Sequence, residues 1–378
     1  MSSRREEHED YLRRMISNSS SPRSPLNDTI ERVHSNRTVE TAHSNQTIES
    51  VHSNQTIEKI PKNSLNYYND LKFGLMNKYK DWDFLDIEGS KKIENIYGET
   101  LKITRRQKID FSLENKNESI KRELASNLKL MPGIGLQTEM KLKREGYKTH
   151  YDLLNHPVYS KRAEKLINRI EKNCFIKDFK LFRSLNKYPN SKNSTIKSLS
   201  SLDPFNLKFM DIETLGLSSA PIILIGIAEI KGKYIESNQY MLRQKEEEPA
   251  LIEAYLSHID EASVHVTYNG ASFDIPFIKN RARLYRIDCN LDQTHFDLMY
   301  PARNLWKDIL PNCKLTTIEE HLFNIKRVDD VPGVYIPDYY NTYLVTKNIG
   351  PLIPIIEHNR MDIVSLADFL MKIYEESF

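Results

Sequence analysis

The sequence predicts an α/β protein whose main folded domain occupies the C-terminal half. Two observations lead to this fold class. Residues 205–378 alternate apolar strand patterns with helical patterns, an order typical of an α/β sandwich. Ahead of them, residues 121–175 read as a small helical module, and residues 1–60 have too few apolar side chains to offset the entropy of ordering the chain. A disordered N-terminal tail is therefore expected.

Charge divides the chain at the start of the α/β region. From Phe205 onward there are 17 Lys and Arg against 25 Asp and Glu, a net charge of −8, whereas the preceding residues carry 37 against 27, a net charge of +10. One part suits a polyanion and the other suits cations. Ordinary drift of surface charge between domains is the alternative.

Composition excludes several classes of protein. Three widely spaced cysteines rule out a disulfide scaffold and a cysteine zinc site. The longest apolar run, residues 220–228, is about half of what a membrane crossing needs, and the charged N-terminus lacks a signal-peptide core. We expect a soluble, intracellular, cytoplasmic protein without a membrane partner.

Residues 1–60 contain a nine-residue repeat that begins at His34, His43 and His52, and its role is not predictable. Residues 61–120 form a small strand-containing region, with strands expected over 82–87 and 94–103 and turns at Gly89 and Gly98. Its Asp86-Ile87-Glu88 imitates a metal-binding Asp-x-Glu but has no partner motif, so we interpret it as a surface strand.

Residues 121–175 are predicted to be helical, and residues 176–204 to be a linker. The Pro132-Gly133-Ile134-Gly135 sequence precedes a helix over 136–145 that ends at Gly146, and a second helix covers 161–172. From Lys121 to Lys172 there are twelve Lys and Arg against six Asp and Glu.

In the α/β region the patterns predict strands over 207–212, 222–230, 234–242 and 264–268, and helices over 249–259, 276–285 and 354–374. Acidic residues stand at the ends of these elements. Asp211 and Glu213 lie two apart at the end of an apolar strand, so they share one face. Asp274 follows a turn after another strand. His358 and Asp362, four apart on the last helix, share a helix face.

Four carboxylates brought together would repel one another unless cations intervened. Oxygen ligands of this kind suit Mg²⁺ or Mn²⁺, and two such ions about 4 Å apart can clamp both reacting oxygens of a phosphodiester. A neutral histidine nearby can take a proton from the attacking water. The set therefore indicates phosphodiester hydrolysis. Taken singly, each residue also fits an ordinary strand end, turn or helix face.

Three stretches carry a resemblance to a known family. FMDIETLGL (209–217), VTYNGASFDIPFI (266–278) and EHNRMDIVSL (357–366) resemble the motifs of DEDD-type 3′–5′ exonucleases of the ribonuclease H-like superfamily. The intervening HFDLMYPARNLW, CKLTTIEEHLF and KRVDDVPGVYIPDYY are similar to its YprB-like branch. The resemblance implies a mixed five-stranded sheet flanked by helices, two metal ions on Asp211, Glu213, Asp274 and Asp362, and His358 as base. His358 stands four residues before Asp362, the spacing usual for family members that use tyrosine.

Further residues in these segments are candidates for secondary roles. Asp297 is either an extra acidic residue near the metals or a buried structural one. The resemblance suggests that Arg303, Lys314 and Arg327 touch phosphates, and Asn269 is a candidate contact to nucleic acid.

The Pro132–Gly135 sequence resembles a helix-hairpin-helix motif. Its glycines permit a tight turn, and the free N–H groups at the start of the following helix can face a phosphate. Gly133, Ile134, Gly135 and Lys141 are the candidate contacts, with Lys143, Arg144 and Lys148 adding charge. A plain glycine-capped hairpin is the alternative. Such motifs grip DNA backbones without reading bases, so DNA is favoured over RNA.

The sequence thus predicts a metal-dependent nuclease, in the first place a 3′–5′ DNA exonuclease with a two-metal mechanism. The alternatives are an RNA exonuclease, a structure-specific endonuclease, or a non-catalytic nucleic-acid-binding protein. Polarity, preferred end structure, pathway and oligomeric state are not predictable from the sequence.

Overall fold

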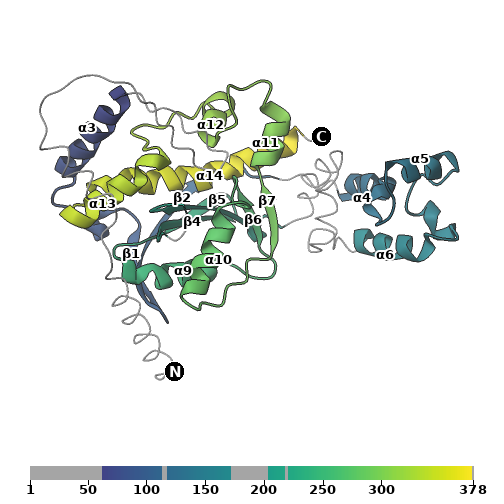
Figure 1. Cartoon of the computed structure of the whole chain (residues 1–378), viewed down its shortest axis with the longest axis horizontal. Helices are drawn as coiled ribbons and strands as arrows, with labels where there is room; N and C mark the ends of the chain where they lie inside the picture. Colours follow the sequence, from purple (N-terminus) through teal and green to yellow (C-terminus); the bar gives the residue numbers. More distant parts are fainter. Residues whose placement is uncertain (1–61, 113–116, 172–202, 218–219, 377–378) are drawn as a thin grey trace, which may run out of the picture. The chain divides into compact units, whose positions relative to one another are not determined.

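The structure is a computed structural model that describes residues 62–112, 117–171, 203–217 and 220–376 (Figure 1). The predicted disordered tail and nearly all of the predicted linker lie outside these residues. The chain separates into two compact units, Met1–Asp70 and Leu71–Phe378. None of the helices in the described ranges has the length and apolar character that a membrane span requires.

A mixed β-sheet flanked by helices forms the centre of the second unit, as the sequence predicts (Figure 1). Strand β3 (Leu207–Thr214) pairs in parallel with β6 (Val264–Thr267), and β6 pairs in parallel with β7 (Thr294–Asp297). On its other side β3 pairs antiparallel with β4 (Ile222–Lys231), which pairs antiparallel with β5 (Tyr234–Met241). These five strands match the sheet that the family resemblance implies.

Two further strands extend the sheet beyond β5. Strands β1 (Ser90–Asn95) and β2 (Gly98–Lys108) form an antiparallel hairpin, and β2 pairs with β5 from Leu101 opposite Met241 to Lys108 opposite Tyr234. The sheet therefore has seven strands in the order β1-β2-β5-β4-β3-β6-β7 among the described residues, rather than the five expected. Leu101 and Ile103, both on β2, are fully buried, so the added hairpin shares in the core.

The prediction of a strand over residues 82–87 is wrong. Phe84–Asp86 form a short 3-10 helix, η2, whose start is closed by a capping box. Asp83 accepts a hydrogen bond from the Leu85 N–H, and Asp86 accepts one from the Asp83 N–H. A local side-chain to backbone bond of this kind competes with strand pairing. It also occupies the carboxylate of Asp86, the residue that imitates a metal ligand in the sequence.

Helices cover both faces of the sheet. Helix α14 (Ile353–Glu375) runs along one face over β3, β4 and β5, and α9 (Glu248–Leu256) and α10 (Asp274–Leu284) lie on the other (Figure 1). The core beneath α14 is built from apolar residues at helical spacing, among them Ile363, Leu366 and Leu370, packed on β3 and β6. The remaining helices of this half are α11 (Met299–Trp306), α12 (Leu315–Phe323) and α13 (Ile336–Thr346).

Helix α3 (Lys62–Lys78) contributes contacts from its second half. Lys72 Nζ lies 2.5 Å from Asp338 Oδ2 of α13, and Asn348 Nδ2 donates to the Met76 carbonyl oxygen at 2.9 Å. Residues well before the sheet thus pack against the loop that leads into α14.

The predicted helical module has a core of its own. It consists of α4 (Asn117–Ser126), η3 (Leu128–Leu130), α5 (Leu136–Arg144), η4 (Asp152–Asn155) and α6 (Ser160–Glu171). Its buried residues come from every one of these elements and from the hairpin loop between η3 and α5. Gly146 ends α5 with a positive φ of 99°, and the Tyr147 N–H donates to the Leu142 carbonyl oxygen at 2.9 Å, as in a Schellman cap.

Candidate active site

Strand β3 places two carboxylates on the sheet face that α14 covers. Asp211 and Glu213 lie two residues apart, so both side chains point to that face. Gly226 of β4 is the partner of Asp211 in the register, and a Cβ at Gly226 would lie 2.1 Å from Asn359 Oδ1. Glycine here makes room for Asn359, whose Nδ2 donates to Asp211 Oδ2 at 3.0 Å.

The turn between β6 and α10 supplies a third carboxylate. Asn269 adopts a left-handed φ of 69°, and Gly270 is packed so tightly that a Cβ there would lie 2.8 Å from Asp274 Oδ2. The turn sets Asp274 at the start of α10, where its Oδ1 accepts a hydrogen bond from the Ile212 N–H at 3.2 Å. Because Ile212 lies between Asp211 and Glu213, Asp274 joins their cluster.

Helix α14 adds the fourth carboxylate and the histidine. His358 Nε2 lies 3.8 Å from Glu213 Oε1 and 3.6 Å from Asp362 Oδ2. The spacing of four residues predicts that His358 and Asp362 turn to the same side, and the structure has them so. Asn359, between them, faces the sheet and also accepts a hydrogen bond from Gln239 Nε2 at 3.0 Å. This hydrogen bond joins β5 to α14, two elements far apart in the sequence.

Three side chains, one on α12 and two in the loop that follows it, hold this arrangement from behind. Asp330 Oδ1 lies 2.6 Å from His358 Nδ1. The guanidinium of Arg327 donates to Asp362, and its Nε and Nη2 donate to the two carboxylate oxygens of Glu319, each at 2.7 Å. Asp362 and His358 are therefore both oriented by partners outside the cluster.

Burial and the repulsion of neighbouring charges raise the pKa values of Asp211, Glu213 and Asp274. Loss of solvent raises the pKa of Asp211 well above its usual range, and the charges of Asp362, Asp274 and Glu213 raise it further. The pKa of Glu213 rises to about 8 for the same first reason, although His358 opposes the shift. Burial raises the pKa of Asp274 to about 7 against its hydrogen bond from Ile212. Each group responds to the others, so the cluster is electrostatically one site.

The pKa of His358 is raised as well, but for a histidine this favours the charged form. Burial alone would lower the pKa of His358, but the charges of Asp362 and Glu213 and the hydrogen bond to Asp330 raise it to about 10. The surrounding carboxylates therefore favour the protonated imidazole, which can act as their counter-ion.

The oxygen chemistry of the donor set suits a hard divalent cation. It consists of four carboxylates with oxygen ligands, drawn from β3, α10 and α14, that destabilise one another when all are ionised. Among the described residues, no three His, Cys, Asp or Glu side chains are close enough in this structure to chelate one ion. The residues that would hold Mg²⁺ or Mn²⁺ are Asp211, Glu213, Asp274 and Asp362.

Comparison with known proteins identifies the domain that carries this cluster. The family described as the RNase_H superfamily matches residues 208–374. These residues form an RNase_H superfamily domain. The chain is 35% identical over 181 residues to the uncharacterized protein YprB of Bacillus subtilis, which covers 46% of this chain and 44% of that protein. It is 30% identical over 128 residues to a DNA polymerase of Methanocaldococcus jannaschii, covering 28% of this chain and 8% of the polymerase. The chain thus spans less than half the length of either relative.

Within the RNase_H domain, Asp297 has a structural part. Its carboxylate accepts hydrogen bonds from the backbone N–H groups of Asn269 at 2.8 Å, Ala271 at 3.1 Å and Met299 at 3.1 Å. It thereby fixes both the turn before Asp274 and the start of α11. Burial raises the pKa of Asp297 against these bonds, and the nearby charge of Arg303 opposes the rise. Of the two interpretations open from the sequence, the structure favours the structural one.

The other residues of the RNase_H domain that the sequence predicts to contact nucleic acid differ in their exposure to solvent. Arg303 is half-buried on α11, and Asn269 borders the turn before Asp274. Arg327 is buried between Glu319 and Asp362, so its guanidinium is not presented to a phosphate in this structure.

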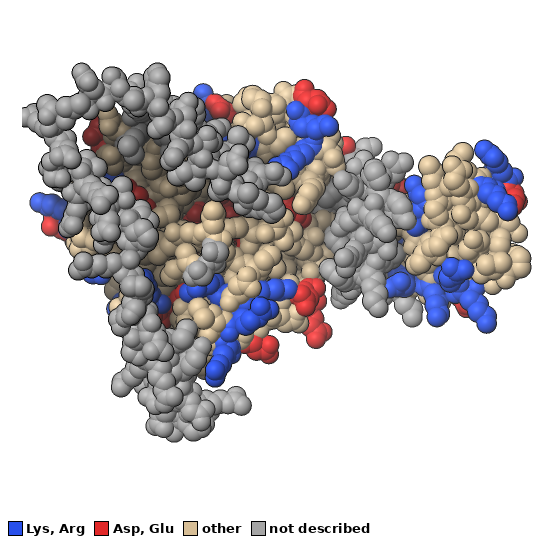
Figure 2. Space-filling model, in the orientation of Figure 1, with Lys and Arg blue, Asp and Glu red and all other residues tan. Residues whose placement is uncertain are grey.

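Gly133, Ile134, Gly135 and Lys141 lie outside the RNase_H domain, in the helical module. Gly133 has a positive φ of 91° and Ile134 is buried in the module core. Gly135 is the N-cap of α5 and contributes no side chain to the first turn. Lys141 is exposed, and its Nζ lies 3.8 Å from Glu145 Oε1. Figure 2 shows Lys and Arg side chains over both α5 and α6.

Sequence reasoning missed Asp330 and Glu319, and it gave Arg327 a different role. All three belong to segments similar to the YprB-like branch, but no spacing relates them to His358 or Asp362. The signal that could have found them is chemical: Glu319 stands among apolar residues of α12, and a charge buried there needs a partner of opposite charge.

Proposed function

We propose that the protein is a metal-dependent nuclease, in the first place a 3′–5′ DNA exonuclease of the DEDD type. One observation carries the proposal: within an RNase_H domain, Asp211, Glu213, Asp274, Asp362 and His358 converge from three elements into one partly buried, electrostatically coupled cluster. The relative that is named a DNA polymerase supports a nucleic-acid substrate.

The four carboxylates would hold Mg²⁺ or Mn²⁺, two ions in the mechanism we propose. When bound, such ions polarise the scissile phosphate and stabilise the charge that develops on the attacking and leaving oxygens. The protein's own part is to keep the carboxylates on one face and partly dehydrated. Asn359 fixes Asp211, the Ile212 N–H fixes Asp274, and Arg327 fixes Asp362.

His358 is the proposed base for the attacking water. Its pKa of about 10 reflects unneutralised carboxylates, so it can accept a proton near pH 7 after their charge is neutralised. Asp330 then has a defined role. Its hydrogen bond to Nδ1 leaves Nε2, the nitrogen that faces Glu213 and Asp362, as the proton acceptor.

The helical module is the proposed grip on DNA. The positive φ of Gly133 turns the chain so that the first N–H groups of α5 are free to face a phosphate. Arg162 stands beside that turn, with Nη1 donating to the Pro132 carbonyl oxygen at 3.0 Å. Contacts of this kind bind the backbone and carry no sequence information.

The decisive experiment replaces single carboxylates. Asp211→Asn and Asp274→Asn should each abolish Mg²⁺- or Mn²⁺-dependent cleavage of end-labelled DNA and leave DNA binding near the level of the unchanged protein. Asp308→Asn, an exposed aspartate on the same domain, serves as the matched control. Cleavage by the Asp211 or Asp274 variant at the control rate would refute the proposal.

The same cleavage assay, carried out with different nucleic acids, determines the preferred substrate. Linear and circular single strands of DNA and RNA, and duplexes with labelled 5′ or 3′ ends, separate the alternatives. Loss of nucleotides from the 3′ end of linear DNA is expected. Preference for RNA would favour an RNA exonuclease, and cleavage of circles would favour an endonuclease. Binding without any cleavage would favour a non-catalytic nucleic-acid-binding protein.

A further inference from the structure

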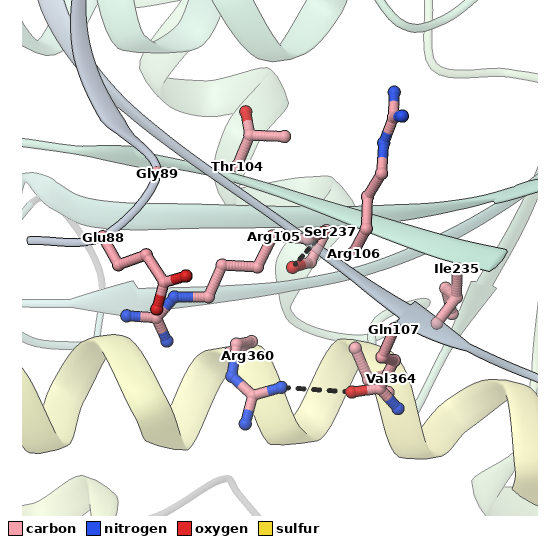
Figure 3. Close-up of a pocket in the computed structure, with 10 residues that line it drawn as sticks. All are labelled: Glu88, Gly89, Thr104, Arg105, Arg106, Gln107, Ile235, Ser237, Arg360 and Val364. Atoms are coloured by element: carbon pink, nitrogen blue, oxygen red, sulfur yellow. Dashed lines mark hydrogen bonds between the residues drawn. The ribbon is translucent and has the colours of Figure 1, made fainter.

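A second polar cavity lies on the flank of α14 that faces away from the carboxylate cluster. It has a volume of about 450 Å³ and is bounded by β2, β5, α14 and the loop before β1 (Figure 3). Arg360 and Val364 line it from α14. They lie on a different stripe of the helix from His358 and Asp362, because positions that differ by three or four residues share a face and these do not.

Two guanidinium groups meet at this cavity and share one carboxylate. Arg105 of β2 donates through Nη1 to Glu357 Oε1, and Arg360 donates through Nε to Glu357 Oε2 at 2.9 Å. Arg360 Nη1 also donates to Gln107 Oε1 at 3.3 Å. Figure 3 shows Arg105 and Gln107 on the α14 side of β2, whereas Arg106 turns the opposite way. Two positive charges are thus held by a single negative one.

One donor of this cluster is buried and unused. Arg105 Nε has no hydrogen-bond partner among the described residues, although it is shielded from solvent. Buried donors without a partner are rare in native structures, so the acceptors among the described residues do not saturate the guanidinium of Arg105.

The opposing charge at the rim of the cavity is Glu88, which is one of its lining residues. Its side chain is exposed and therefore screened by solvent.

We propose that this cavity binds a phosphate group of a nucleic-acid strand or nucleotide, with Arg105 and Arg360 as its ligands. A guanidinium offers several N–H donors in a planar fork that matches phosphate oxygens, and both Arg105 and Arg360 line this cavity. The volume admits a nucleotide unit, with Ile235 and Val364 as an apolar wall. This site is separate from the carboxylate cluster and does not depend on cleavage.

The test measures binding by the full chain without divalent ions, so that no cleavage intervenes. The probes are a labelled 12-nucleotide single strand, AMP and inorganic phosphate. Arg105→Gln and Arg360→Gln should each weaken binding about three- to tenfold and lower the salt dependence of strand binding by about one ion. Glu88→Gln should act in the opposite direction and strengthen binding. Arg283→Gln, an exposed arginine of α10, is the control of equal charge change.

Each outcome bears on the proposal. Weaker binding of the strand alone assigns the site to a strand phosphate, and weaker binding of AMP or phosphate as well assigns it to free phosphate esters. No difference from Arg283→Gln for all three probes overturns the proposal. If an arginine variant unfolds, as thermal unfolding would reveal, the Glu88→Gln variant still gives a signed result. Loss of metal-dependent cleavage in Asp211→Asn tests the nuclease proposal independently.

Discussion

Among single residues, a chain of ion pairs between residues of opposite charge supports the candidate active site. Glu319 is fully buried on α12 and binds Arg327 through both of its carboxylate oxygens. Arg327 in turn binds Asp362, and His358 lies between Asp362 and Asp330. Removing one member of such a buried pair leaves an uncompensated charge and typically costs about 3–5 kcal/mol. These residues therefore position the groups that we place in the reaction.

Asp330→Asn tests the positioning role at His358. The carboxylate of Asp330 raises the pKa of His358, so its loss should lower that pKa. The pH at which cleavage activity rises, because His358 loses its proton there, should then be lower. We also expect kcat to fall about tenfold, as for other residues that orient a catalytic group, with KM nearly unchanged. The rate of cleavage from pH 5.5 to 9 measures both, and an unmoved profile would contradict the assignment.

Among the elements, the β1–β2 hairpin is the addition that changes the fold most. It covers the edge of β5, whose backbone groups would otherwise be unpaired. Ile103 of β2 is fully buried, whereas Ile96 at the hairpin turn is 75% exposed. The hairpin should therefore contribute to the stability of the whole sheet and not only to its own region.

Ile103→Ala and Ile96→Ala form a matched pair of truncations. Ile103→Ala should lower the free energy of unfolding by about 2–5 kcal/mol because it leaves a cavity in the core. Ile96→Ala should change it by less than about 0.5 kcal/mol because the side chain is in solvent. Urea denaturation followed by circular dichroism gives both values. Equal effects would mean that the hairpin does not share the core of the sheet.

In the helical module, a buried histidine makes stability depend on pH. Burial lowers the pKa of His150 to about 4, against its hydrogen bond to the Asn127 carbonyl oxygen. The unfolded chain has the ordinary value of about 6.5, so it binds more protons and is favoured as the pH falls. The stabilising effect is complete above about pH 6.5 and is lost progressively toward pH 4.

Lowering the pH from 7 to 5 should therefore destabilise the module by about 2 kcal/mol. Hydrogen exchange of the α5 and α6 amides, corrected for the intrinsic exchange rate, measures this loss. His150→Gln removes the titrating group, so protection in that variant should change less over the same range. An equal change in both proteins would show that another group is responsible.

For the whole molecule, the stability of the RNase_H domain should depend on pH and on bound divalent cations. The pKa values of Glu213, about 8, and Asp274, about 7, are raised in the folded state. Folding therefore takes up protons, and this contribution to stability is lost as the pH rises toward 8. A divalent cation reverses that loss because it binds the deprotonated carboxylates.

The stabilisation by Mn²⁺ should accordingly be larger at pH 8 than at pH 6. We expect a rise in Tm of several degrees at saturating Mn²⁺, since a ligand at about 100 times its Kd adds about 2.7 kcal/mol. Asp211→Asn should remove most of the rise, and Asp308→Asn should retain it. Differential scanning calorimetry of the full chain is the measurement. A rise that is independent of pH would place the cation elsewhere.

Prediction from the sequence was possible where a local pattern carries the information. The apolar run of β3 with Asp211 and Glu213 at its end, the Asn269-Gly270 turn before Asp274, and the four-residue spacing of His358 and Asp362 are all properties of short stretches. Strand and helix periodicity determines which side chains share a face. The coarse fold class and the candidate ligands follow from these stretches.

Tertiary structure alone decided which distant elements meet. That β2 pairs with β5 across more than a hundred residues, that Gly226 leaves room for Asn359, and that Arg327 and Asp330 reach Asp362 and His358 are not encoded in any local period. The physical reason is that sheet order and buried charge pairing depend on contacts between segments remote in the chain. Each segment is compatible with several partners until the whole core is packed.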